Sequence, residues 1–116
     1  MTYQSFEDLE VWKKSSELAV KIYEILEGCK DYGLKDQMTR AVVSIPSNIA
    51  EGCERDSKSE TVRFLHIAKG SAAELRTQIY IAQRINLIVE TTADEFISDL
   101  KKISAMLHNL INNFKS

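Results

Sequence analysis

The sequence is poor in residues that interrupt helices and in residues that build small metal or redox sites. Among its 116 residues it has one proline, four glycines and two cysteines. Cys29 and Cys53 lie far apart and form no C-x-x-C pair, which excludes the local dithiol motifs of redox and zinc proteins. We interpret both as small core residues in a reducing compartment, since free cysteine is among the most buried residue types.

The sequence also lacks long apolar runs and an excess of basic charge. No apolar run approaches the roughly 20 residues that a bilayer-spanning helix needs, and the N-terminal segment lacks the regions of a signal peptide. We therefore expect a cytoplasmic protein. The net charge is −2 and the pI about 5.7, whereas dedicated nucleic-acid-binding domains are usually basic. Net charge does not describe how the charges are distributed.

Motifs of the common catalytic sites are absent. His66 and His108 are the only histidines, and neither lies within one helical turn of a cysteine or of the other histidine. The sequence has no glycine-rich phosphate loop, no nucleophile elbow and no Glu-x-x-His motif. We therefore predict that the protein is not an enzyme and has no catalytic residues, metal site or cofactor.

Apolar residues at helical spacing are what the sequence has instead. They predict an all-α fold, an up-down-up-down four-helix bundle in a single domain over 1–116. Short connections separate the four amphipathic segments, which cover 6–29, 34–53, 57–86 and 92–115. No segment has a strand pattern strong enough to compete.

The ends of these helices carry capping signals. Ser57 to Glu60 and Thr92 to Glu95 have the spacing of a capping box. The hydroxyl of Ser5 is expected to accept from the amide of Asp8. Gly52 is expected to end the second helix in the left-handed conformation.

Two residues inside the predicted helices are unusual there. Pro46 interrupts an apolar pattern of helical spacing, and a proline in a helix interior costs about 3 kcal/mol. We expect the second helix to run through Pro46 with a kink. Gly70 costs about 1 kcal/mol relative to alanine in a helix, so we expect another helix to pack closely against it.

Four blocks of residues, taken together, resemble a known family. They are Phe6-Glu-Asp-Leu-Glu-Val-Trp12, Tyr32-Gly-Leu-Lys-Asp-Gln37, Arg40-Ala-Val-Val-Ser-Ile-Pro-Ser-Asn-Ile-Ala-Glu-Gly52, and Arg63-Phe-Leu-His-Ile-Ala-Lys-Gly-Ser-Ala-Ala-Glu-Leu75 with Thr77-Gln78 and Ile81-Ala82. In this order and spacing they resemble the 23S ribosomal RNA intervening-sequence proteins, over residues 6 to about 89.

The resemblance implies a four-helix bundle that assembles as a ring-like homopentamer, and a link to nucleic acid. Some members of the family are encoded inside inserts of large-subunit ribosomal RNA genes. A related, strongly basic bundle protein is the accessory factor of a retroelement reverse transcriptase. This chain departs from the pattern in its negative net charge and in having Thr39-Arg40 where many members have two arginines.

Polar residues at spacings of three or four form one candidate site on the second and third helices. One interpretation is a hydrogen-bond network that fixes how helices or subunits register, and the other is a ligand site. The residues are Arg40, Ser44, Asn48, Glu51, Ser71, Glu74 and Gln78.

Basic residues of the third helix form the other candidate site. The segment 57–86 has five basic and two acidic residues, a net charge of +3. Lys69, Arg76 and Arg84 lie seven and eight residues apart, so they share a face that a five-membered ring would repeat as a basic collar for phosphates. A solvated helix face is the alternative. The candidate nucleic-acid-binding residues are Arg55, Arg63, Lys69, Arg76 and Arg84.

These observations lead to two functional hypotheses. In the first, the protein is a non-catalytic homo-oligomeric adaptor, a pentamer by resemblance, that binds RNA or DNA or a nucleic-acid enzyme through the third helix. In the second, it is a structural or protein-binding ring with no nucleic-acid role.

Overall fold

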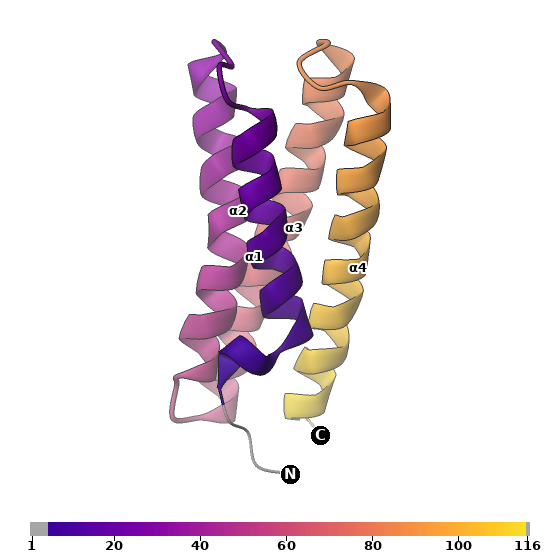
Figure 1. Ribbon diagram of the computed structural model, residues 1–116. Helices are drawn as coiled ribbons and strands as arrows, with labels where there is room; N and C mark the ends of the chain where they lie inside the picture. The colour runs from indigo at the N-terminus through magenta and orange to yellow at the C-terminus, as the bar shows by residue number, and fades with distance from the viewer. Residues whose placement is uncertain (1–4, 116) are drawn as a thin grey trace.

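The chain folds into four helices that pack side by side. The computed structural model describes residues 5–115, and in that range it has no strand. The elements are a 3-10 turn η1 (Phe6–Asp8) and the helices α1 (Glu10–Ile25), α2 (Tyr32–Cys53), α3 (Lys58–Arg84) and α4 (Glu90–Lys115). Successive helices run in opposite directions (Figure 1). The predicted all-α four-helix bundle is therefore confirmed.

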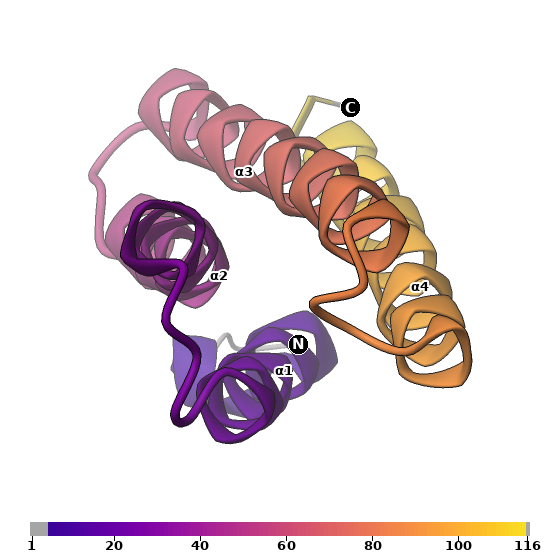
Figure 2. The same ribbon diagram turned by 90° about the horizontal axis from the view of Figure 1, so that it is seen from above.

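The bundle is an elongated body of 45 × 20 × 20 Å. α2 packs on α1 and α3, and α3 packs on α4, whereas α1 and α4 touch over a smaller area. Seen from above, the four helices are arranged around a common centre (Figure 2), and their buried apolar side chains form one core. No helix within residues 5–115 combines the length and apolarity that crossing a bilayer requires.

The core consists of the apolar rows that the sequence pattern indicates. In α3 the whole predicted row is buried, namely Leu65, Ala68, Ala72, Leu75, Ile79 and Ala82. In α4 the row is buried from Phe96 to Leu107, while Leu110 and Phe114 are half-buried. Cys29 and Cys53 are also half-buried and pack against this core.

The first helix is shorter than the predicted 6–29. Ser5 caps the separate turn η1 by accepting from the amide of Glu7 at 3.2 Å, not from that of Asp8. Leu9 is extended, with φ −75° and ψ 127°, and α1 begins after it. The chain leaves α1 after Ile25 and turns at Gly28, whose φ of 78° only glycine adopts without strain.

Other helix ends also differ from the prediction because different residues cap them. α2 begins at Tyr32, since the carboxylate of Asp31 accepts from the amide of Leu34 at 3.1 Å. α4 begins at Glu90, so Thr92 lies inside its first turn and the predicted capping box there is wrong. The Ser57 cap is confirmed, because its hydroxyl accepts from the amide of Glu60 at 3.2 Å.

α3 ends with a hydrogen-bonded motif around a left-handed asparagine. Asn86 has a φ of 64°. The amide of Leu87 donates to the carbonyl of Ala82 at 2.8 Å, and the amide of Asn86 donates to that of Gln83 at 3.1 Å. This is the 6→1 and 5→2 pattern of a Schellman cap, and it ends the helix at Arg84, two residues before the predicted end.

Three residues inside the helices have different outcomes. α2 continues through Pro46, which is buried; the kink stays a prediction. Gly52 is not a left-handed cap. A Cβ added to it would lie 2.9 Å from Cβ of Phe64 and 3.1 Å from the carbonyl oxygen of Thr61, so Gly52 lets α2 and α3 approach closely. Gly70 is exposed, and no other helix of the described chain approaches it. The expected close contact is therefore absent within one copy, and a contact with a second copy stays a prediction.

Candidate nucleic-acid interface

The antiparallel helices α3 and α4 bring basic side chains to a shared groove. Nζ of Lys69 on α3 lies 3.5 Å from Nδ1 of His108 on α4, which fixes the level at which the two helices meet. Arg76 lies about two turns beyond Lys69, and Lys101 lies about two turns before His108. Because the helices are antiparallel, Arg76 and Lys101 face the same groove about two helical turns away from Lys69 and His108.

The row on α4 continues in the other direction to Lys115. This lysine lines a hollow together with Lys58 and Val62 of α3. We call this surface the basic groove and define it by Lys69, Arg76, Lys101, His108 and Lys115. The two α3 members are half-buried and the three α4 members are exposed. The α3 side chains therefore pack their stems against α4 and present their charged heads to water.

The cations of the basic groove have no carboxylate partner within residues 5–115. Ion pairs in that range join Lys13 to Glu10, Lys14 to Asp99, Lys21 to Glu17, Arg40 to Asp36 and Arg55 to Glu51. The two acids of α3, Glu60 and Glu74, are rotated by about 180° and 140° from Lys69 at 100° per residue. The positive charge of the groove is therefore uncompensated by its own helix.

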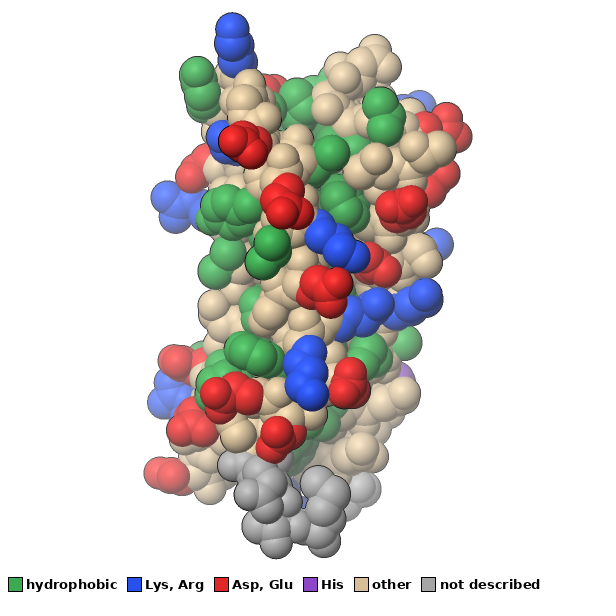
Figure 3. Space-filling view, in the orientation of Figure 1, with side chains coloured by type: hydrophobic (Ala, Val, Ile, Leu, Met, Phe, Trp, Pro, Cys, Tyr) green, Lys and Arg blue, Asp and Glu red, His purple; other side chains and the backbone are tan. Residues whose placement is uncertain are grey.

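The face that α1 presents contrasts with this arrangement. There, acidic and basic side chains are interspersed (Figure 3). Five acidic residues pair with cations on surfaces outside the basic groove. A net charge of −2 is compatible with a local basic site.

A shallow hollow lies at one end of the basic groove. It has a volume of about 550 Å³ and is lined by Tyr80, Asp94, Ile97, Ser98, Lys101, Lys102 and Ala105. Tyr80 is 48% exposed and lies about one turn beyond Arg76 on α3. Asp94 marks the acidic limit of the groove, near the first turn of α4.

The structure divides the five predicted nucleic-acid-binding residues between separate places. Lys69 and Arg76 are in the basic groove. Arg84 is exposed at the last residue of α3, rotated by about 80° from Arg76. The guanidinium carbons of Arg55 and Arg63 lie 4.6 and 4.5 Å from the ring centroid of Phe64, at the opposite end of α3.

Sequence reasoning missed the α4 half of this groove. Lys101, His108 and Lys115 are spaced seven residues apart, which places them on one face of a helix. This spacing could have grouped the three residues from the sequence alone. It could not have shown that their face lies beside Lys69 and Arg76, because that depends on how α3 packs against α4.

Three of the seven predicted polar residues form a hydrogen-bonded cluster between α2 and α3. The hydroxyls of Ser44 and Ser71 lie 2.9 Å apart. The side-chain amide of Asn48 donates to the carbonyl of Ser44 at 2.8 Å and to its hydroxyl at 2.9 Å. This cluster joins the two helices near the middle of α2.

The other four predicted polar residues lie outside that cluster. Arg40 pairs with Asp36 at 2.9 Å, and Glu51 pairs with Arg55 at 2.8 Å. Glu74 is exposed. Gln78 is 7% exposed, and its Oε1 has no hydrogen-bond partner among the described residues.

Exposed isoleucines accompany Gln78 on the side of α3 nearest α2. Ile67, Ile81 and Ile85 are 41%, 48% and 52% exposed. Helical spacing places them on the same side of α3 as Ser71 and Gln78. We call this surface, with Ser44 and Asn48 of α2, the α2/α3 face.

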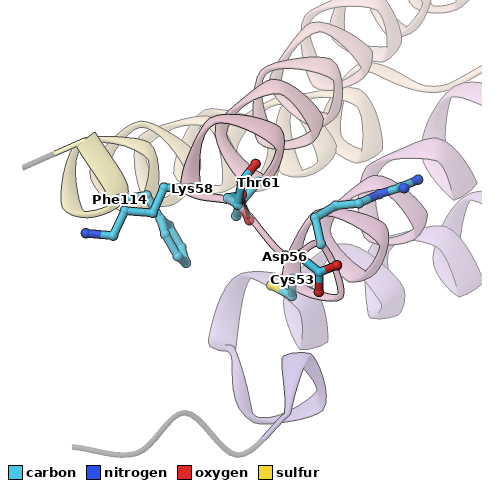
Figure 4. Close-up of a pocket in the computed structure, with 7 residues that line it drawn as sticks. Cys53, Asp56, Lys58, Thr61 and Phe114 are labelled. Carbon is cyan, nitrogen blue, oxygen red and sulfur yellow. Dashed lines mark hydrogen bonds between the residues drawn. The ribbon is translucent and has the colours of Figure 1, made fainter.

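A more enclosed hollow lies at the end of the bundle where α2 meets α3. Its volume is about 260 Å³, and Phe114 and Lys58 lie across it from Cys53 and Asp56 (Figure 4). Thr61 uses its hydroxyl structurally, donating to the carbonyls of Gly52 at 2.8 Å and Ser57 at 3.1 Å. In the described part of the chain, no three His, Cys, Asp or Glu side chains are grouped to hold a metal ion.

The chain is similar to proteins of one known family. The 23S rRNA-intervening sequence protein family matches residues 7–109. The chain belongs to this family. A crystal structure of a protein with unknown function from the S23 ribosomal protein family of Bacteroides thetaiotaomicron is similar to it, with a TM-score of 0.82 and 28% sequence identity. The match covers 87% of this chain and 97% of that chain. No curated protein matches the chain.

Proposed function

We propose that this family member is a non-catalytic, homo-oligomeric bundle that binds RNA or DNA through the basic groove between α3 and α4. The observation that carries the proposal is the double row of basic side chains, Lys69 and Arg76 on α3 and Lys101 and Lys115 on α4, without carboxylate partners in residues 5–115. Phosphates that bind such cations release condensed counterions, and this release drives association.

Two further observations support this site over other surfaces. Arg55 and Arg40 already have carboxylate partners, so phosphate would have to compete with those carboxylates. The Lys69 and Arg76 stems are half-buried, which limits the rotamer freedom that binding would remove. The basic groove is therefore less neutralised than those surfaces, and its two α3 side chains lose less rotamer freedom on binding.

The test is a salt-dependent titration of fluorescently labelled RNA and DNA. The variant Lys69→Ala/Arg76→Ala/Lys101→Ala removes three groove charges. We expect weaker binding and a plot of log K against log salt that is shallower by about 2 to 3, since each lost phosphate contact contributes roughly 0.7 to 0.9 to the slope.

The matched control removes three charges elsewhere. Lys13→Ala/Lys21→Ala/Arg40→Ala has the same change in net charge, and each of these residues lies in an exposed ion pair on α1 or α2. Equal losses in both variants, or no binding by the natural protein at low salt, would overturn the proposal. A protein-binding ring without a nucleic-acid role would then be favoured, with Glu90, Asp94, Glu95 and Asp99 as the surface for a basic partner.

Copies of the chain associate, in this proposal, through the α2/α3 face. Its exposed isoleucines and the unpartnered amide oxygen of Gln78 would gain both apolar contact and a donor from a second copy. This face lies on the side of α3 away from α4. An oligomer built through it, a pentamer by family resemblance, leaves each basic groove open.

A further inference from the structure

We infer that the basic groove takes single-stranded rather than duplex nucleic acid, and that Tyr80 stacks on one of its bases. This inference rests on the proposed function and names the ligand class of the same site. It starts from the one aromatic side chain that lines the hollow at the end of the groove.

Tyr80 has the surroundings of a stacking platform. It is 48% exposed, it follows Arg76 by about one turn of α3, and it shares its hollow with Ile97 and Lys101. Ile97 and Ala105 add apolar surface to the lining of this hollow, and the exposed Lys101 and Lys102, which also line it, are available to the adjoining phosphates. Cationic grooves that include such aromatics are the general means of binding single strands without reading their sequence.

The position of Tyr80 disfavours a duplex. Tyr80 lines a hollow between two helices, so a base that stacks on its ring has to turn out of its own stack toward that hollow. In a duplex the bases are stacked on one another and are reached only by flipping them out, which costs a few kcal/mol. A single strand presents unstacked bases without that cost.

The charges also define the path of the strand across the surface. Asp94 closes the hollow on one side and repels phosphate there. From Tyr80 the groove runs past Arg76 and Lys101, then past Lys69 and His108, to Lys58 and Lys115. On α4, Lys101, His108 and Lys115 are seven residues apart, or about 10 Å along the helix. The strand therefore lies along the helices and contacts cations from both sides.

The experiment compares one RNA in two forms. A fluorescein-labelled 12-nucleotide RNA without self-complementarity is titrated into the natural protein, alone and annealed to its complement. The expected result is tighter binding of the single strand. Tyr80→Leu should weaken single-strand binding by roughly 5- to 150-fold, and Tyr80→Phe, which retains the ring, should leave it unchanged.

Two readouts separate stacking from other effects. Tyr80→Leu should leave the slope of log K against log salt unchanged, because no phosphate contact is lost. Tyr23→Leu is the matched control, since Tyr23 is a 53% exposed tyrosine on α1, and it should bind as the natural protein does.

The outcomes distinguish this inference from the proposed function. If the duplex binds as tightly as the single strand, or if Tyr80→Leu binds normally, the inference is wrong while the groove proposal stands. If neither form binds at low salt, both are wrong.

Discussion

Two glycines in neighbouring helices have opposite surroundings. Gly52 lies where α2 meets α3, and a Cβ there would be 2.9 Å from Cβ of Phe64. Gly70 lies on an exposed part of α3, where a Cβ would meet nothing within 4 Å. From the sequence alone the close contact was expected at Gly70, because helical spacing cannot say which glycine another backbone approaches.

The two alanine substitutions should therefore change stability in opposite directions. Gly52→Ala forces two backbones apart, and overpacking costs about 1–3 kcal/mol against a gain of about 1 kcal/mol in helix propensity. We expect it to lower the free energy of unfolding. Gly70→Ala should raise that free energy by up to about 1 kcal/mol. Urea unfolding at a fixed protein concentration measures both.

A contrary result at Gly70 would be informative. If Gly70→Ala lowered stability in a concentration-dependent way, a second copy of the chain would be packing on this residue. The sequence-based expectation of a close contact would then hold between chains rather than within one.

At the scale of the element, the interiors of the helices follow from the sequence better than their ends. The row from Leu65 to Ala82 is buried as its spacing predicts, because any helix formed there places these apolar residues on one face and buries that face. The ends depend on which of several nearby caps forms. Asp31 caps α2, which begins two residues before the predicted start at residue 34, and α4 begins two residues before Thr92.

Two substitutions distinguish a cap that forms from one that does not. Ser57→Ala removes the acceptor for the amide of Glu60 and should lower the free energy of unfolding by about 1 kcal/mol. Thr92→Ala should change it by less than about 0.5 kcal/mol, because Thr92 lies inside α4 and caps nothing. Denaturant titrations of the two variants, with the natural protein as reference, make the comparison. Equal losses would contradict the assigned start of α4.

The candidate site was predictable in part for the same reason. Lys69 and Arg76 share a helix face, and helical spacing suffices to group them. Lys101 and Lys115 belong to another helix, so their place opposite Lys69 depends on the register of α3 against α4. Arg55 and Arg63 were grouped with Lys69 by sequence proximity, but their contacts with Phe64 lie at another part of α3.

For the whole molecule, the main expectation concerns the assembly. Ile67→Asp/Ile81→Asp places two carboxylates on the α2/α3 face, and burying them between copies would be unfavourable. We expect light scattering to show a smaller species than the natural protein forms, with unchanged helical circular dichroism.

The control for this expectation is Val20→Asp on α1. Val20 is 59% exposed and lies outside the α2/α3 face, so this variant should keep the natural assembly. If the double variant assembled normally while Val20→Asp did not, the interface would involve α1 instead. A natural protein that is monomeric at all concentrations would refute self-association altogether.

The contact between α1 and α4 is the smallest of the contacts between neighbouring helices, so the helices are not held equally firmly. α1 has 16 residues against 22 to 27 in the other helices, and it is held chiefly by α2. Local opening follows the weakest packing, so we expect the amide protons of α1 to exchange with solvent before those of α3. α3, which forms one side of the basic groove, packs against both α2 and α4, so we expect it to stay folded in fluctuations that open the contact between α1 and α4.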